Sequence, residues 1–365
     1  MARGTKFAAF EVSLASGRLI DEPAKKREEE QRMRLLVAGG AGYVGSALIP
    51  KLLERGYLVD VVDLFWFGNN LPTETGLLSK DLFDMTVEDL KDYDQVIFLA
   101  GLSNDPMAEF SPNKNFVYNA AAPAYLAYIA KKAGVKRYVY ASSCSVYGYT
   151  VNELYDETRP VASSYPYGIS KLQGEQGVMS LVDDRFSVIA LRKGTISGYS
   201  PRMRLDLIVN TMFRTALHEG VITINNPSIW RPILAMEDAI SAYIRVIEAH
   251  ESISGTFNIA SGNYTVGEVG DLVKAEVEQQ LGAKISLTIR HMQDIRNYKV
   301  SIEKAKNVLS FHPQSDVRGI VRELIKEMDK FSDWDNPLYH NIQVFRELDS
   351  KIGNHALGKL VGAGR

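Results

Sequence analysis

The chain has 365 residues, of which 45% are hydrophobic, and a formal net charge of −2, so it can bury a large core but offers no basic surface for nucleic acid. Its single cysteine excludes an intramolecular disulfide, no Cys/His cluster has metal-site spacing, and no apolar run reaches the roughly 18 residues that span a membrane. We therefore expect a soluble, cytoplasmic protein that acts on a small molecule, with no metal, nucleic acid or membrane as a partner.

Residues 1–31 are predicted to be an extension outside the folded core. They show no sustained apolar period, and the charged run at 25–30 cannot bury much surface. A solvated tail is the favoured interpretation, and an arm that regulates the protein or joins subunits is the alternative. At the other end of the chain, residues 350–365 are predicted to be a loose tail.

Residues 35–46 have the pattern of a strand, a glycine-rich turn and the start of a helix. Glycines in such a turn remove side chains where the backbone turns tightly, approaches a pyrophosphate and lets the helix pack on the strand. The helix then directs its free N–H groups and positive dipole end at the pyrophosphate. The pattern predicts a dinucleotide site, and we assign to cofactor binding Gly39, Gly42, Tyr43, Val44 and Gly45.

A second strand, at 57–63, ends in Asp63, 18 residues after Gly45, and the dinucleotide fingerprint has a ribose-binding acid about 20 residues on. The Asp63 carboxylate can accept hydrogen bonds from both adenosine ribose hydroxyls, and its charge repels a 2′-phosphate. The predicted cofactor is therefore NAD rather than NADP; the alternative is that Asp63 only caps a loop. Asp81, after a short third strand, is predicted to receive the adenine amino group, with an ordinary exposed acid as the alternative.

The chain next alternates between strands and helices. Apolar strands are predicted at 95–101 and 136–142, with a helical period at 115–133 between them. This alternation favours an α/β fold with a Rossmann-type, doubly wound parallel sheet. The strand at 95–101 ends in small residues that let the backbone approach a cofactor, and we assign to cofactor binding Leu99, Ala100 and Gly101.

The later chain is predicted to form a smaller, C-terminal substrate-binding region. Its helical periods and short strands follow one another at 206–219, near Val221, at 237–250, near Thr256, at 266–281, near Ile285 and at 315–331. A last helix is predicted within 334–349. We therefore divide the chain into an NAD-binding domain at 32–192 and a mainly substrate-binding region at 193–349.

Ser143, Tyr167 and Lys171 form a candidate catalytic set. Tyr167 and Lys171 are four residues apart, which places them on one face of a helix. A phenol has a pKa of about 10, and we expect the Lys171 ammonium and a positively charged nicotinamide to lower it toward about 7, so that Tyr167 can take a hydroxyl proton. Ser143 would hold the same substrate oxygen, and Lys171 would also bind the nicotinamide ribose. The alternative is a chance spacing on an amphipathic helix.

Together these features resemble the extended short-chain dehydrogenase/reductase family, in particular its nucleotide-sugar epimerases and dehydratases. The similar stretches are the turn at 39–45, Asp63, and the segments 142–148, 167–171 and 230–233, and the resemblance extends over about residues 33–331. It implies that the Ser/Tyr/Lys set is catalytic, that the later chain binds a nucleoside diphosphate sugar, and that the protein is a homodimer.

The resemblance also assigns individual residues. It implies that Asn119 lies near the cofactor and that Arg231 meets the substrate diphosphate, a task that suits a bidentate guanidinium. Arg296 is a weaker candidate of the same kind, and a surface salt bridge is the alternative for both arginines.

Two departures from the family pattern affect the expected reaction. Dehydratases of the family usually carry an Asp-Glu pair directly after the catalytic hydroxyl residue, and this chain has Cys144-Ser145 there, so water elimination lacks its proton donor. Cys144 itself is expected to be a buried, unreactive thiol. In the segment 191–198, Thr195 stands where many relatives have asparagine. The candidate substrate-binding residues are therefore Ser145, Thr195, Arg202, Asn210, Arg231 and Arg296, with solvated side chains as the alternative for Arg202 and Asn210.

We interpret the chain as an NAD-dependent epimerase that acts on a nucleoside diphosphate sugar through a transient keto intermediate, with retained NAD. A nucleotide-sugar reductase or dehydrogenase with the same three catalytic residues is the main alternative. A 4,6-dehydratase and a protein that senses NAD without chemistry are less favoured.

Overall fold

The computed structural model describes residues 32–291 and 296–352. The predicted extension at 1–31 lies outside the described residues, as does the tail from 353 on, and residues 350–352 belong to the last helix, α12 (Asn341–Ile352). In the described part of the chain, no helix combines the length and the apolar character that a membrane span requires.

A seven-stranded parallel sheet runs through the protein in the order β11-β7-β5-β4-β1-β2-β3. Its strands are β1 (Arg34–Ala38), β2 (Leu58–Asp63), β3 (Gly76–Ser79), β4 (Gln95–Phe98), β5 (Arg137–Ser143), β7 (Ser187–Lys193) and β11 (Gly255–Ile259). The strand order reverses between β1 and β4, and ligands of such sheets bind at the carboxyl ends of the strands beside that point. The predicted Rossmann-type sheet is confirmed.

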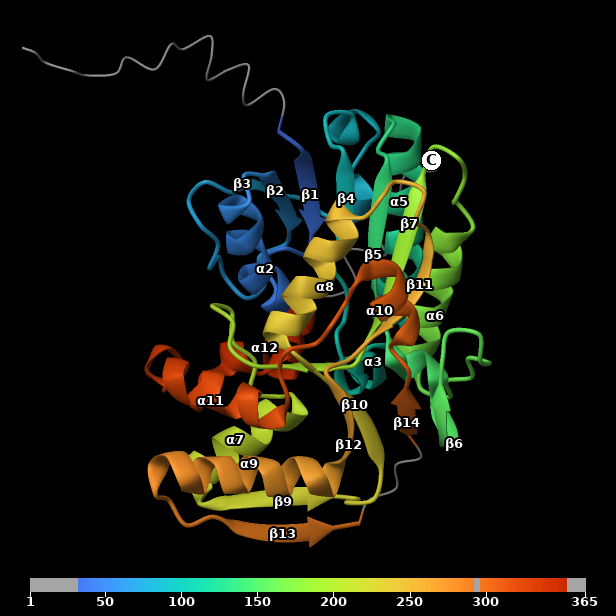
Figure 1. Ribbon diagram of the computed structural model, residues 1–365. Helices are drawn as coiled ribbons and strands as arrows, with labels where there is room; N and C mark the ends of the chain where they lie inside the picture. Colours follow the sequence, from blue (N-terminus) through green and yellow to red (C-terminus); the bar gives the residue numbers. More distant parts are fainter. Residues whose placement is uncertain (1–31, 292–295, 353–365) are drawn as a thin grey trace, which may run out of the picture. The chain divides into compact units, whose positions relative to one another are not determined.

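Helices cover both faces of this sheet (Figure 1). Alternate β1 residues belong to separate cores: Leu35 and Val37 pack with α2 (Tyr43–Glu54) and α8 (Met236–Glu248), whereas Leu36 and Ala38 pack with α5 (Ala122–Ala133). Because both faces are covered, β1 is apolar throughout its buried length. The second core also holds α6 (Pro166–Met179), and α3 (Asp105–Phe110), α4 (Pro112–Phe116) and a π-helical turn lead from β4 to α5.

Much of the later chain forms a smaller region beside the large sheet, although β11 and α8 belong to that sheet and the helices on it (Figure 1). The division of the chain at 192/193 stays a prediction. A three-stranded sheet contains β8 (Thr195–Ser197), β10 (Trp230–Ala235) and β12 (Gly262–Thr265), and two parallel pairs join β9 (Val221–Asn225) to β13 (Ser286–Arg290) and β6 (Tyr149–Tyr155) to β14 (Asn297–Val300). Helices α7 (Ile208–Glu219), α9 (Val266–Leu281) and α11 (Val317–Glu327) pack on one another, and α10 (Glu303–Leu309) contacts β11.

The ends of β1 and β4 approach so closely that Gly39 has no room for a side chain. Its φ is +76°, and a Cβ there would lie 2.5 Å from the Ala100 Cα. Gly56 has a similar φ of +83° with nothing within 4 Å of its Cβ position. We expect Gly56→Ala to cost only the left-handed strain of about 1–2 kcal/mol and Gly39→Ala to cost clearly more. Urea unfolding of both variants measures this difference, and equal losses would contradict the close approach.

Candidate active site

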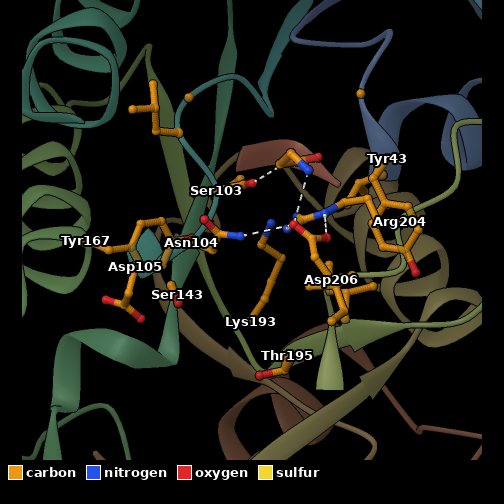
Figure 2. Close-up of a pocket in the computed structure, with 18 of the residues that line it drawn as sticks. Tyr43, Ser103, Asn104, Asp105, Ser143, Tyr167, Lys193, Thr195, Arg204 and Asp206 are labelled. Atoms are coloured by element: carbon orange, nitrogen blue, oxygen red, sulfur yellow. Dashed lines mark hydrogen bonds and ion pairs between the residues drawn. The ribbon is translucent and has the colours of Figure 1, made fainter. Parts of the chain in front are cut away.

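A cavity of about 660 Å³ lies between the carboxyl ends of the parallel strands and the segment that follows β7 (Figure 2). The glycine turn and the ends of β2, β4 and β5 form one wall, and the segment after β7 forms another. In the described part of the chain, no group of three or more His, Cys, Asp or Glu side chains is placed to hold a metal.

The glycine turn leaves room for a ligand at the start of α2. A Cβ on Gly45 would lie 2.2 Å from the Gly40 carbonyl oxygen, so this helix start can pack on the turn only without a side chain. Gly42 precedes α2 and offers its N–H groups no side-chain cap, and the first turn has no acidic residue. The positive end of α2 therefore faces the cavity free of a competing side-chain acceptor.

Asp63 joins the end of β2 to this turn. Its carboxylate accepts hydrogen bonds from the Ala41 N–H at 2.9 Å and the Phe65 N–H at 2.8 Å. Burial raises the pKa of Asp63, and these backbone bonds oppose the shift. Each carboxylate oxygen keeps a second lone pair, so this capping role is compatible with ribose binding from the cavity side.

The other predicted cofactor residues divide into two groups. Leu99, Ala100 and Gly101 line the cavity, as expected, but Asp81 and Asn119 do not. Asp81 instead accepts hydrogen bonds from the Phe83 N–H at 2.9 Å and the Tyr118 hydroxyl at 3.3 Å, so it caps a short helical turn.

Asn119 supports the loop after β4 from behind. It lies in the π-helical turn Val117–Ala121 and donates to the Leu102 carbonyl oxygen at 2.9 Å. A Cβ on Gly101 would lie 2.1 Å from the Asn119 Oδ1, which is buried without a hydrogen-bond partner among the described residues. Asn119 therefore shapes the cofactor wall without lining it.

The three predicted catalytic residues line the same cavity. Ser143, at the end of β5, is hydrogen-bonded to the Tyr167 phenol and accepts a hydrogen bond from the Ser145 hydroxyl at 2.9 Å. The Lys171 ammonium, one turn after Tyr167 on α6, donates to the Ala141 carbonyl oxygen at 3.0 Å and lies 6.0 Å from the Tyr167 ring centroid. The set can hold one hydroxyl oxygen and move its proton.

The predicted lowering of the Tyr167 pKa is not found in the protein chain by itself. Burial raises the pKa of Tyr167 well above its usual value, and the hydrogen bond from Ser143 offsets only part of this. Burial also lowers the pKa of Lys171 to about 7, with a further lowering from Lys193. The charge of the lysine alone favours a lower Tyr167 pKa, but burial penalises the charged form of both groups and outweighs it.

A buried ion pair next to the predicted catalytic residues joins three elements. The Arg192 guanidinium of β7 binds the Glu175 carboxylate of α6 with nitrogen–oxygen distances of 2.5 and 3.0 Å, and the Ser142 hydroxyl of β5 donates to the same carboxylate at 2.6 Å. The Cys144 thiol donates to the Arg192 carbonyl oxygen at 3.1 Å, and burial raises its pKa, which agrees with the predicted unreactive thiol.

Lys193 is a site residue that the sequence interpretation missed. It ends β7, lies beside Ser143 in the sheet register and lines the cavity. Burial lowers the pKa of its ammonium to about 8. The signal in the sequence is a lysine that directly follows Arg192 at the carboxyl end of a strand whose core is apolar.

Of the predicted substrate residues, Ser145, Thr195, Arg231 and Arg296 line the cavity. Arg231 donates to the Arg296 carbonyl oxygen, and its guanidinium lies 5.4 Å from the Tyr298 ring centroid. Arg296 forms an ion pair with Asp105. The two arginines therefore lie together at one end of the cavity.

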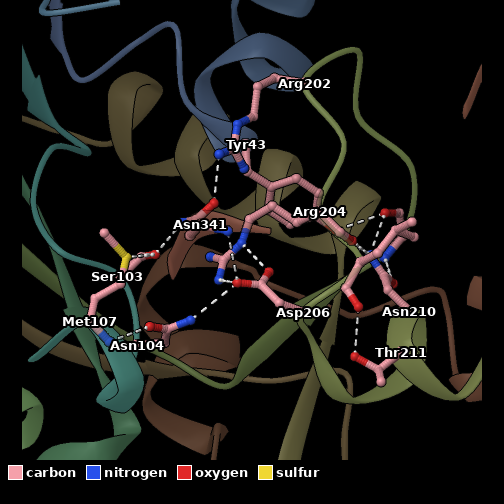
Figure 3. Close-up of polar contacts among 12 residues, drawn as sticks. Tyr43, Ser103, Asn104, Met107, Arg202, Arg204, Asp206, Asn210, Thr211 and Asn341 are labelled. Atoms are coloured by element: carbon pink, nitrogen blue, oxygen red, sulfur yellow. Dashed lines mark hydrogen bonds and ion pairs between the residues drawn. The ribbon is translucent and has the colours of Figure 1, made fainter. Parts of the chain in front are cut away.

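Asn210 does not line the cavity. Its amide donates to the carbonyl oxygens of Gly198 at 3.2 Å and Arg204 at 2.7 Å and accepts from the Gly198 N–H at 3.0 Å (Figure 3). These bonds satisfy the amide within the protein, so Asn210 holds the loop after β8 rather than a ligand.

Arg202 lines the cavity at the Asp63 end, where the cofactor residues gather. Its Nη2 donates to Asn341 of α12 at 2.5 Å, and its guanidinium lies 3.7 Å from the Phe67 ring centroid (Figure 3). Burial lowers its pKa to about 9, and its Nε and Nη1 have no hydrogen-bond partner among the described residues. Its position therefore favours a cofactor contact over the predicted substrate contact.

These features fit a bound dinucleotide. The turn has no side chains in the way, a carboxylate stands at the ribose position, and the Arg202 guanidinium, which lines the cavity, has unused hydrogen-bonding capacity. A diphosphate is the kind of anion that suits the start of α2. The residues of this chain that would hold it are those of the glycine turn, with Asp63 and the loop after β4.

The chain is similar to known proteins over most of its length. The model of the NAD-dependent epimerase/dehydratase family matches residues 35–260. UDP-glucuronic acid decarboxylase 3 of Arabidopsis thaliana is 28% identical over 308 residues, which cover 79% of this chain and 87% of that protein. UDP-glucose 4-epimerase of Corynebacterium glutamicum is 26% identical over 312 residues, covering 80% and 94%. The structure of MoeE5 in complex with UDP-glucuronic acid and NAD has a TM-score of 0.72 at 25% identity, covering 81% of this chain and 99% of that one.

We expect Glu175→Gln to destabilise the protein strongly, because it leaves the Arg192 charge buried without its counter-charge. Removal of one partner of a buried pair costs about 3–5 kcal/mol. Glu54→Gln is the control, since the Lys51–Glu54 pair is exposed and such pairs contribute about 0–1 kcal/mol. Denaturant unfolding gives both values, and a Glu175→Gln loss no larger than that of the control would refute the role of the pair.

The unfolding free energy should depend on pH through the buried Lys171 and the half-buried Lys193. Their folded pKa values of about 7 and about 8 lie below the ordinary 10.5, so the unfolded chain binds more protons between these values and stability rises with pH over that range. Lys193→Met should be more stable than the parent at pH 7, and this advantage should shrink toward pH 9.5. The measurement is urea unfolding of both proteins in the same cofactor state, with exposed Lys51→Met as the control. A constant difference across this range would rule out the shift at Lys193.

Proposed function

The chain belongs to the NAD-dependent epimerase/dehydratase family, whose cofactor is NAD, and we propose that it is an epimerase acting on a nucleoside diphosphate sugar through a transient keto intermediate. The observation that carries this proposal is the meeting of Ser143, Tyr167 and Lys171 in one cavity, with no free acid–base pair beside them in the described part of the chain. The relatives and structural neighbours include epimerases, decarboxylases and a dehydratase, so the reaction must be argued from the site.

Each catalytic residue has a role that follows from its contacts. When bound, NAD accepts a hydride from a sugar carbon and returns it. Ser143 holds the hydroxyl oxygen on that carbon, and Tyr167 takes its proton and later gives it back. The Lys171 ammonium, one turn away, supplies positive charge that favours the Tyr167 phenolate against the cost of burial. Inversion then requires only that the keto sugar turn before the hydride returns.

Among the described residues, the cavity has no free acid of the kind that elimination of water would need. Its carboxylates in the described residues are Asp63, Asp105 and Asp206. Asp63 accepts two backbone N–H groups, and the other two form ion pairs with Arg296 and Arg204. At Ser145, where dehydratases resembling this chain carry an acidic residue, there is a hydroxyl bonded to Ser143. These contacts favour proton exchange at a hydroxyl over proton transfer at a neighbouring carbon.

The diphosphate of the substrate has matching groups in the same cavity. Arg231 and Arg296 lie next to each other in its lining, and planar guanidinium groups suit a diphosphate. The substrate would then lie with its nucleotide toward these arginines and its sugar toward Ser143. The homodimer and the cytoplasmic location stay predictions.

We expect Tyr167→Phe to lower kcat by about 10²–10⁴-fold, since it removes the group that exchanges the proton. The exposed Tyr128→Phe on α5 is the matched control and should keep parental activity. Holoenzyme is incubated with a panel of nucleotide sugars, the product configuration is read by NMR, and reduced nicotinamide is followed by absorbance.

An inverted sugar without net reduced nicotinamide supports the epimerase. Cofactor consumed in proportion to product would instead make the protein a dehydrogenase or reductase. Parental turnover in Tyr167→Phe would remove Tyr167 from the mechanism.

A further inference from the structure

Lys193 occupies a defined place beside the reacting centre. It is the sheet partner of Ser143, so the two Cα atoms stand on neighbouring strands, which are about 4.8 Å apart, with both side chains on the same face. Figure 2 shows the Lys193 side chain rising into the cavity between Ser143 and Tyr167 on one side and Asp206 on the other. Its ammonium therefore reaches the space next to the substrate oxygen that Ser143 holds.

The Lys193 ammonium has no anionic partner among the described residues. It lies over the Tyr243 ring, with the centroid 5.8 Å away, and it is close enough to Lys171 to lower the pKa of that ammonium. By contrast, Arg204 is paired with Asp206 and Arg296 with Asp105, and the Lys171 ammonium donates to a backbone carbonyl. A half-buried ammonium beside another cation is stabilised by a counter-charge, and an anionic group of the ligand would supply one.

The diphosphate of the substrate is not that anion. In a pyranose it is attached at C1, and the ring carbon farthest from C1 is C4. If Ser143 and Tyr167 hold the C4 hydroxyl, the diphosphate lies at the other end of the ring, toward Arg231. The substituent nearest to the reacting hydroxyl on the C5 side is C6, which is a neutral hydroxymethyl group in a hexose and a carboxylate in a hexuronate.

The groups around Lys193 suit a carboxylate. Ser145 and Thr195 also line this part of the cavity and carry hydroxyl groups. The Lys193 ammonium and the Thr195 hydroxyl can donate to the several lone pairs of a carboxylate, whereas a hydroxymethyl group leaves the ammonium without a counter-charge.

We propose that Lys193 binds the sugar carboxylate of a nucleoside diphosphate hexuronate, whose C4 hydroxyl is held by Ser143 and Tyr167. This inference rests on the proposed function, because it takes the Ser/Tyr pair as the place of the reacting hydroxyl. It makes Lys193 the residue that selects an acidic sugar over the matching neutral one.

The test compares matched substrates that differ only in the carboxylate, such as UDP-glucuronate and UDP-glucose. The test uses holoenzyme of four proteins: the parent, Lys193→Met, Lys193→Arg and the control Lys136→Met. Lys136 is a suitable control because it is an exposed lysine at the opposite end of the sheet. Binding is measured by calorimetry and turnover by product NMR. The parent should prefer the uronate. Lys193→Met should weaken uronate binding and raise its KM about 10- to 100-fold, the range for a charged hydrogen bond, with less than about 3-fold change for the neutral sugar, and Lys193→Arg should restore part of the preference.

The outcomes separate this inference from the proposed function. If the parent binds the neutral sugars as well as the uronates, or if Lys193→Met weakens both alike, the assignment of Lys193 is wrong, whether or not a sugar is inverted. If the uronate is preferred and the preference depends on Lys193, but no sugar is inverted, the inference holds and the epimerase proposal fails.

Discussion

The Glu175–Arg192 pair is the constraint on which the site depends. Both side chains are almost fully buried, with 7% of Arg192 and 5% of Glu175 exposed, so neither charge can turn to water if the geometry loosens. Its residues are neighbours of the site along the chain: Glu175 is one helical turn after Lys171, and Arg192 directly precedes Lys193. Ser142, which also binds Glu175, directly precedes Ser143. One planar, bidentate contact thus fixes α6, β5 and β7 relative to one another.

The pair is itself held in place from the next strand. The Arg192 Nη1 donates to the Tyr147 hydroxyl at 2.8 Å, and that hydroxyl is hydrogen-bonded to Asn258 of β11 at 2.9 Å. A network in which every member has a partner rigidifies its surroundings, because the low dielectric penalises any broken contact. The positions of the site residues therefore depend on groups that do not line the cavity themselves.

The features that sequence predicted best are those whose signal is local. The glycine turn, the apolar strands and the Tyr167–Lys171 spacing each depend on a few consecutive residues, and the structure brings them together at the switch point of the sheet. Strands such as β8, β12 and β14 were missed, because they are short and gain stability only from partners distant in the chain.

Asp81 and Asn210 were assigned by type and position, but hydrogen bonds within the protein use their polar atoms. Lys193 can be recognised as a site residue only from the sheet register, because the pairing of β5 with β7 places it beside Ser143.

The two walls of the cavity differ in how freely evolution or a designer can alter them. On the cofactor side, side chains at Gly39, Gly45 and Gly101 would collide with the main chain or with Asn119, so this surface tolerates little variation. On the opposite side, Lys193 and Thr195 project into the space and can be exchanged with less disturbance of the backbone. Substitutions on the side of Lys193 and Thr195 can therefore change the substrate preference, while the cofactor side and its redox chemistry stay the same.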